Sequence, residues 1–175
     1  MKIIFIPAKI KSEINEEKIR TLKLPKNTAI AYSIQYKNIA EKIKKALSDK
    51  YSITGIVQVL GCSKPIFPKS TEAVLLVTSG RFHAVALAFE TKLPVYILES
   101  NKLKKVSEEE IYAFEKRKHA SYMQFLNAEK VGILVSTKPG QENLKKAIQL
   151  KNRFKDKESY LFLANDIDTR QFENF

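Results

Sequence analysis

Two patterns of hydrophobic and polar positions alternate along this chain. Short apolar runs rich in β-branched residues are typical of buried strands. They occupy Lys2–Ile6, Thr28–Ile34, Ile53–Leu60, Ala73–Thr78, Leu93–Leu98, Lys130–Ser136 and Tyr160–Ala164. Apolar residues at helical spacing between them predict helices. These cover Ser12–Thr21, Lys37–Lys50, Ala84–Glu90, Ser107–Ala128 and a segment from Leu144 to Phe154. The alternation predicts an α/β fold with mostly parallel sheets flanked by helices.

The order of strand, turn, helix and strand occurs twice. Ala29–Leu60 has this order, and Val131–Ala164 repeats it. Two copies of one α/β unit explain the echo most simply. We expect residues 1–106 to form the first unit and residues 107–175 to form a second, incomplete one.

The expected boundary combines a connector and a helix start. Asn101–Val106 is polar and basic, so we expect it to be a connector. Ser107 is followed three residues later by Glu110, which is the spacing of a capping box. A helix is therefore predicted to begin at this serine.

Composition narrows the class of protein. The chain has 175 residues and a net charge of +12. Such a surplus fits nucleic acid, an acidic protein or an anionic ligand. Lysine dominates, however, and the aromatic interleaving of an RNA-binding sheet is absent, so nucleic acid is not an expected partner. No apolar run is long enough for a membrane span, and the start lacks a signal-peptide pattern. A single cysteine excludes an internal disulfide, and we expect a cytoplasmic protein.

The single cysteine follows a predicted strand. Ile53–Leu60 ends just before Gly61 and Cys62. Ligands of an open parallel sheet bind outside the carboxyl ends of its strands, so Cys62 lies where such a sheet places its chemistry. The alternative is a buried thiol that acts as a small hydrophobic residue.

A glycine-headed turn follows the buried strand Ala73–Thr78. Gly80 allows a close backbone approach, and the next amide groups can face an anion. Arg81 can hold a carboxylate in a fork. The alternative is that Arg81 pairs with a surface acid and that His83 is structural.

A second turn, Ser136–Gln141, also opens a predicted helix. It suits the ribose or carboxylate end of a ligand, or it is a plain turn that Pro139 and Gly140 explain. Gln35 occupies the corresponding turn of the first unit and has the same two interpretations. The chain has no nucleophile triad, zinc-ligand spacing, dinucleotide fingerprint or phosphate loop.

Three blocks together resemble a known family. They are Val59-Leu60-Gly61-Cys62, then Gly80-Arg81-Phe82-His83, then Ser136-Thr137-Lys138-Pro139-Gly140-Gln141. In this order they are similar to the diphthamide synthesis enzymes, the 2-(3-amino-3-carboxypropyl)histidine synthases. Ile4–Ala8, Leu93–Tyr96 and Glu115–Ala120 resemble the same family, so the similarity covers nearly the whole chain.

The resemblance implies three related α/β domains around a central site. Each domain gives one cysteine to a 4Fe-4S cluster, which binds S-adenosylmethionine and delivers an electron to it. The resulting 3-amino-3-carboxypropyl radical attacks a histidine of translation elongation factor 2 and leaves methylthioadenosine. Cys62 matches the middle cysteine and is the implied metal ligand. The implied cofactor-binding residues are Gln35, Gly80, Arg81, Phe82, His83, Ser136, Thr137, Lys138, Gly140 and Gln141.

The chain matches the family's second domain and most of its third. We therefore expect a partial or split subunit, a transferase only within a complex. Other chains, in a homo- or hetero-oligomer, would supply the missing cysteines, and an electron donor would reduce the cluster. Two alternatives stay open: a non-catalytic scaffold subunit of the same complex, and a basic α/β module that binds nucleotide or RNA.

Overall fold

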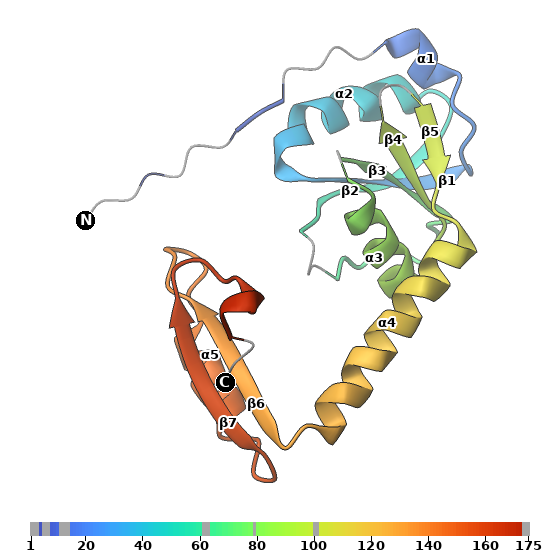
Figure 1. Cartoon of the computed structure of the whole chain (residues 1–175). Coiled ribbons are helices and arrows are strands. Elements are labelled where there is room, and N and C mark those ends of the chain that lie inside the picture. The colour runs from blue at the N-terminus through green and yellow to red at the C-terminus, as the bar shows by residue number, and fades with distance from the viewer. Residues whose placement is uncertain are drawn as a thin grey trace. The chain divides into compact units, whose positions relative to one another are not determined.

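The computed structural model of the chain describes residues 4, 8–10, 15–60, 64–78, 80–99 and 102–172. The chain forms two compact units, Phe5–Arg117 and one that includes Lys118–Phe175 (Figure 1). Apart from Ile4, the strand expected over Lys2–Ile6 lies outside the described residues, as does the expected helix cap at Ser12. No helix of the described part of the chain is long and apolar enough to cross a membrane.

A five-stranded sheet of order β2-β1-β3-β4-β5 forms the centre of the larger unit (Figure 1). Its strands are β1 (Asn27–Tyr32), β2 (Ser52–Gln58), β3 (Ala73–Val77), β4 (Val95–Glu99) and β5 (Lys102–Lys105). The first four are mutually parallel, and β5 pairs antiparallel with β4. The prediction of a mostly parallel α/β fold is therefore confirmed.

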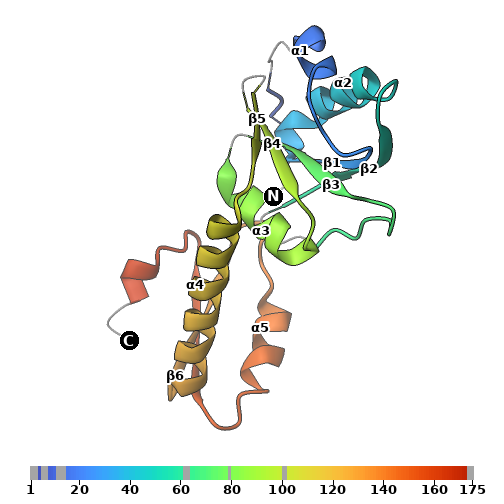
Figure 2. The same cartoon turned by 90° about the vertical axis from the view of Figure 1, so that its right-hand side faces the viewer.

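Helices cover both faces of this sheet (Figure 2). The helices α1 (Glu16–Arg20) and α2 (Lys37–Leu47) lie on one face, and α3 (Arg81–Thr91) lies on the other. Along β3, Leu75 and Val77 pack with α1 and α2, whereas Val74 and Leu76 pack with α3. All four are buried, which explains why this strand is an uninterrupted apolar run.

The segment expected to be a connector is partly a strand. Lys102–Lys105 forms β5, with Glu99 of β4 opposite Lys102 and Tyr96 opposite Lys105. Three of its four residues are lysines, and the side chains at these positions are exposed. Only Leu103 packs against the core. With a single apolar residue, this segment shows no alternation of apolar and polar positions from which a strand could be predicted.

The strand order creates a switch point between β1 and β3. From β1 the chain passes through α2 to β2 on one side, and from β3 it passes through α3 to β4 on the other. The two connections leave on opposite faces of the sheet. Open α/β sheets bind ligands in the crevice that such a reversal leaves at the carboxyl ends of the strands.

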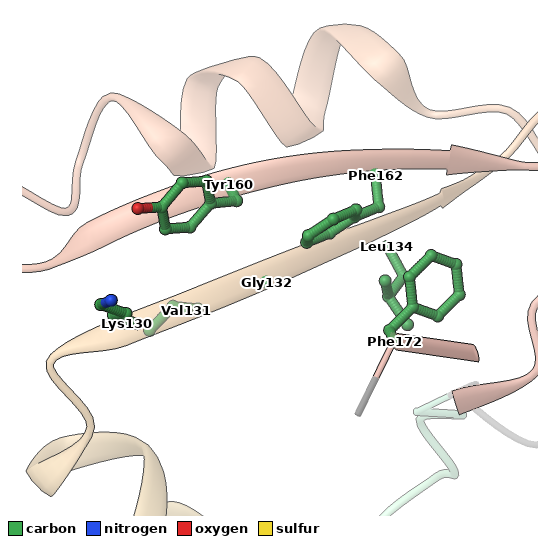
Figure 3. Close-up of a pocket in the computed structure, with 7 residues that line it drawn as sticks. All are labelled: Lys130, Val131, Gly132, Leu134, Tyr160, Phe162 and Phe172. Carbon is green, nitrogen blue, oxygen red and sulfur yellow. The ribbon is translucent and has the colours of Figure 1, made fainter. Parts of the chain in front are cut away.

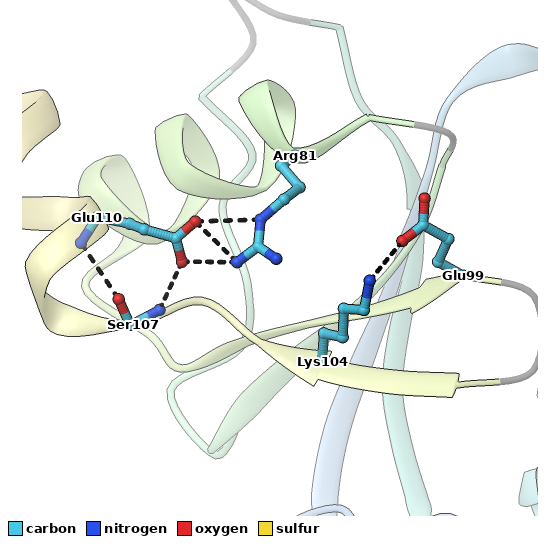
Figure 4. A network of polar contacts seen from close by, with 5 residues as sticks. All are labelled: Arg81, Glu99, Lys104, Ser107 and Glu110. Atoms are coloured by element: carbon cyan, nitrogen blue, oxygen red, sulfur yellow. Dashed lines mark hydrogen bonds and ion pairs between the residues drawn. The ribbon is translucent and has the colours of Figure 1, made fainter.

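The helix α4 (Glu108–Asn127) begins at the predicted capping box (Figure 4). The backbone N–H of Ser107 donates to Glu110 Oε2 at 3.0 Å, and the Glu110 N–H donates to Ser107 Oγ at 3.3 Å. The bond from Ser107, and next the bond from Arg81, lower the pKa of the Glu110 carboxyl. Within α4, which the structure describes completely, no residue is buried. The two units divide inside this helix, whereas the sequence places the boundary at its start.

The smaller unit is a second β-α-β arrangement. The strands β6 (Lys130–Ser136) and β7 (Glu158–Ala164) pair in parallel, and α5 (Leu144–Lys151) packs on one face. The short helix η2 (Thr169–Phe172) follows β7, as η1 (Ile34–Tyr36) follows β1 in the larger unit. The expected repetition of strand, helix and strand is thus confirmed.

Removing a core side chain from the central strand is expected to destabilise the larger unit. Leu75 is 0% exposed, so Leu75→Ala leaves a cavity and should cost about 3 kcal/mol of unfolding free energy. Urea denaturation followed by circular dichroism measures this change. Ile66→Ala is the control, since Ile66 is 96% exposed and its loss should cost less than about 0.5 kcal/mol. Equal effects of the two substitutions would contradict the packing described.

Acid is expected to weaken the start of α4. The folded pKa of Glu110 lies below its unfolded value of about 4.3, so its stabilisation is complete above that value. The stabilisation is lost as the pH falls through the folded pKa. Glu110→Gln should cost about 1 kcal/mol at pH 7 and flatten the acid decline of the melting temperature. Glu108→Gln, in the same helical turn but outside these bonds, is the control; an unchanged acid decline in Glu110→Gln would refute the assignment.

Candidate functional site

The carboxyl ends of β1, β2 and β3 lie side by side. The Ser33 N–H donates to the Val77 carbonyl at 3.3 Å, and the Val59 N–H donates to the Tyr32 carbonyl at 2.9 Å. The hydroxyls of Ser33 and Thr78 share a hydrogen bond of 3.3 Å. Three successive turns therefore leave the sheet at one edge, and this edge contains the switch point.

Gln35 belongs to the first of these turns, and the chain that leaves β2 leads in sequence to Cys62. Gln35 lies in η1, directly after β1. Cys62 itself lies outside the described residues, between Leu60 and Lys64. Its role as a metal ligand stays a prediction. Among the residues that the structure describes, no group of three or more histidines, cysteines and acids could hold a metal ion.

The turn Gly80–His83 leaves β3 and opens α3. Gly80 is the N-cap residue in extended conformation, and a Cβ there would meet no described atom within 4 Å. The side of Gly80 is thus open to an approaching ligand. Phe82 is 66% exposed, and its ring lies edge-on to His83 and Phe114, with centroid distances of 5.9 and 6.5 Å. The Gly80–His83 motif therefore places an exposed aromatic ring near the edge of the sheet where β1, β2 and β3 end.

Arg81, the first residue of α3, pairs with an acid of α4. Its Nε donates to Glu110 Oε1 at 3.0 Å, and its Nη2 donates to Glu110 Oε2 at 2.7 Å. This is the surface-acid pairing that the sequence leaves open as an alternative. The third nitrogen of the guanidinium, Nη1, points away from Glu110 (Figure 4). Binding of a ligand carboxylate by Arg81 therefore stays a prediction.

In the smaller unit, the turn after β6 is held by the end of β7. The Thr137 N–H donates to the Ala164 carbonyl at 2.9 Å, and the Ser136 hydroxyl donates to the Asn165 carbonyl at 3.4 Å. Lys138 forms an ion pair with Asp166, and its hydrogen bond to that carboxylate is the main reason that the pKa of Asp166 is lowered.

The same turn then bends sharply towards α5. The Gln141 N–H donates to the Lys138 carbonyl at 2.9 Å. Gly140 has a φ of 77°, in the left-handed region that glycine adopts at little cost. The sequence predicts this turn. The positive φ of Gly140 is enough to explain a glycine at this position, without a role in ligand binding.

A cavity of about 330 Å³ lies beside this turn. The polar residues that line it are Ser136, Gln141, Asn143 and Lys146. Val135, Ala147 and Ile167 contribute apolar surface to its walls. The structure therefore brings Ser136 and Gln141 together at one cavity, whose lining is mostly apolar but includes a hydroxyl, two amides and an ammonium group.

The opposite face of β6 and β7 carries an aromatic groove of about 470 Å³ (Figure 3). Its lining consists of Lys130, Val131, Gly132, Leu134, Tyr160, Phe162 and Phe172. The Phe162 and Phe172 rings lie 5.3 Å apart at 57°. A Cβ on Gly132 would come within 3.2 Å of the Phe162 ring, so the glycine lets that ring lie close against β6.

Sequence reasoning missed this groove and found no aromatic interleaving. The available signal was Tyr160 and Phe162 at alternate positions of one strand, because such positions share a face. The Tyr160 hydroxyl donates to Glu158 Oε2 at 3.0 Å, which raises the pKa of Tyr160.

The candidate residues fall into both units. Gln35 and Gly80–His83 belong to the larger unit, and Ser136–Gln141 belongs to the smaller one. The resemblance implies that these turns and Cys62 belong to one central site, and this stays a prediction.

Comparison with known proteins gives relatives of one kind. A family model described as "Putative diphthamide synthesis protein" matches residues 1–175. The chain is 32% identical over 155 residues to a 2-(3-amino-3-carboxypropyl)histidine synthase of Methanocaldococcus jannaschii, covering 81% of this chain and 42% of the relative. It is 30% identical over 120 residues to the synthase of the same name from Pyrococcus horikoshii, covering 67% of this chain and 35% of that protein.

Solved structures share the fold. A crystal structure of Dph2 from Pyrococcus horikoshii matches with a TM-score of 0.73 and 23% identity, over 92% of this chain and 50% of the other. A crystal structure of the same protein with a 4Fe-4S cluster matches with the same score and identity, over 87% of this chain and 48% of the other. The chain thus spans half the length or less of these relatives. Because the family model matches from the first residue to the last and the fold agrees, the chain belongs to the diphthamide synthesis family.

Proposed function

We propose that this chain works as part of a 2-(3-amino-3-carboxypropyl)histidine synthase. The reaction transfers the 3-amino-3-carboxypropyl group of S-adenosylmethionine to a histidine of translation elongation factor 2. The observation that carries the proposal is the switch-point edge, where the turns after β1 and β3 present Gln35 and Gly80–His83 and the chain after β2 leads to Cys62. Curated relatives with the synthase name support it.

The chain offers a single thiolate, which can bind one iron of an iron–sulfur cluster. Cys62 supplies this thiolate and is the only cysteine of the chain. It follows the end of β2 by four residues. Clusters of the 4Fe-4S type are held by several thiolates, so the remaining ligands come from outside these 175 residues. When bound, the cluster supplies the electron that splits the bond between sulfur and the aminocarboxypropyl carbon. A separate electron donor reduces it.

Residues of this chain bind and orient the cosubstrate. At the amino end of α3, backbone N–H groups and the free edge of Arg81 suit the carboxylate of the methionine moiety. In the smaller unit, Ser136 and Gln141 suit ribose hydroxyls, since a hydroxyl and an amide each donate and accept hydrogen bonds. Phe82 offers an exposed ring against which an aromatic group can pack.

A scaffold role within the same complex is the neighbouring alternative. In that case the chain would support partner chains and the elongation factor without binding iron. The two roles differ in one measurable property, the requirement for the thiol of Cys62.

Cys62→Ala is expected to abolish turnover. After anaerobic reconstitution with iron and sulfide in the presence of its partner chains, the wild-type complex should show iron–sulfur absorbance and make methylthioadenosine when reduced. The variant should lose more than 90% of this product, on the order of what loss of a cluster ligand produces, while it still binds the partners. Ser63→Ala is the control and should keep wild-type turnover. Normal turnover in Cys62→Ala would reject the ligand role and favour the scaffold.

The aromatic groove favours a second candidate function, binding of nucleotide or single-stranded RNA. Tyr160, Phe162 and Phe172 present rings on an open sheet face, with Lys130 at the same groove. Bases stack on such rings with about 1–3 kcal/mol per base, and a lysine can neutralise a phosphate.

Substitution of Tyr160 tests this second function. If the groove stacks bases, Tyr160→Ala should weaken binding of a short single-stranded RNA about tenfold in fluorescence anisotropy at fixed salt. Tyr122→Ala is the matched control, because Tyr122 is a similarly exposed tyrosine on α4, 58% against 48%. Equal affinities of the two variants, or no binding by the wild type, would exclude the groove as an RNA site.

A further inference from the structure

The Arg81 guanidinium is fixed along one edge. Its Nε and Nη2 donate to the two carboxylate oxygens of Glu110, at 3.0 and 2.7 Å. A bidentate bond of this kind fixes both the position and the plane of the guanidinium. The amino group that takes no part in it, Nη1, points to the side away from Glu110 (Figure 4).

Glu110 is itself held in place. Its Oε2 accepts the Ser107 N–H at 3.0 Å, and its own N–H donates to Ser107 Oγ at 3.3 Å. The acid therefore cannot turn away from Arg81 without breaking the cap of α4. Ring contacts of Phe114 with Phe82 and Phe89, at centroid distances of 6.5 and 5.4 Å, hold this part of α4 against α3.

This pairing has two opposing effects on an incoming anion. Glu110 neutralises the charge of Arg81, which weakens long-range attraction for any anion. It also orders the guanidinium in advance, which saves much of the rotamer entropy that an arginine otherwise loses on binding. The α3 amino end next to Arg81 restores part of the attraction through its partial positive charge. The arrangement therefore favours a correctly placed carboxylate over anions in general.

We propose that Glu110 is the positioning residue of the carboxylate site, orienting Arg81 so that Nη1 binds the carboxylate of the methionine moiety of S-adenosylmethionine. This inference rests on the proposed function for the identity of the ligand. Glu110 does not touch the ligand; it acts through Arg81.

Side-chain NMR of the full chain tests the orientation directly. S-adenosylhomocysteine is the probe, since it carries the carboxylate and does not react. Methylthioadenosine is the matched ligand, since it lacks the aminocarboxypropyl group. In the wild type, the Arg81 Nε–H resonance, assigned by its loss in Arg81→Lys, should shift saturably with the first probe and not with the second.

Glu110→Gln should weaken the response to S-adenosylhomocysteine about tenfold, the effect expected when a hydrogen bond to a charged group loses its geometry. Binding of methylthioadenosine should stay unchanged, and Glu108→Gln should behave like the wild type. No shift of Arg81 in the wild type, or an unchanged affinity in Glu110→Gln, would overturn the inference.

A charge-swapped pair separates positioning from simple stabilisation. Arg81→Glu combined with Glu110→Arg should recover much of the melting temperature that either single change loses, because the ion pair can form in reverse. The response to S-adenosylhomocysteine should stay lost, because the arginine now lies on α4. Recovery of both would show a purely structural pair and overturn the inference. If the wild type binds the probe through Arg81 but no reconstituted complex makes methylthioadenosine, the positioning role holds and the proposed synthase function fails.

Discussion

The parallel pairing of β1 with β2 on one side and β3 on the other is the constraint on which the larger unit depends. Tyr32 at the end of β1 lies opposite both Gln58 and Val77. This register brings three strand ends to one edge, so the turns that follow these strands all begin at that edge. The crossover from β1 to β2 runs through α2 and that from β3 to β4 runs through α3, so helices cover both faces and Ile30 and Leu76 are buried on opposite sides. The location of the candidate site follows from backbone pairing before any side chain of the site is considered.

Glu110 shows how one side chain can serve two levels of structure. Locally it completes the cap of α4, a role fixed by its three-residue distance from Ser107. Across the fold it joins the start of α4 to the first residue of α3. The start of α4 and the orientation of the Arg81 guanidinium at the candidate site thus depend on the same carboxylate.

The sequence predicts best those elements whose burial repeats along the chain. Lys130–Ser136 is found as predicted, and Ala73–Thr78 differs from β3 by one residue, because apolar runs report burial directly. β5 is missed because its partner strand, and not its own pattern, makes it a strand. The contact between Arg81 and Glu110 joins residues 29 apart and follows from the packing of two helices, which no local pattern encodes. The aromatic groove depends likewise on η2 folding back to bring Phe172 to Phe162.

The lysines of β5 have a consequence for the behaviour of the protein in concentrated solution. β5 is the outermost strand on its side of the sheet, with Lys102, Lys104 and Lys105 exposed along it. A strand from another molecule that paired there would have to desolvate these ammonium groups and bring them against its own side chains, which opposes edge-to-edge association. The lysines that make β5 hard to recognise in the sequence therefore also oppose aggregation through this edge of the sheet.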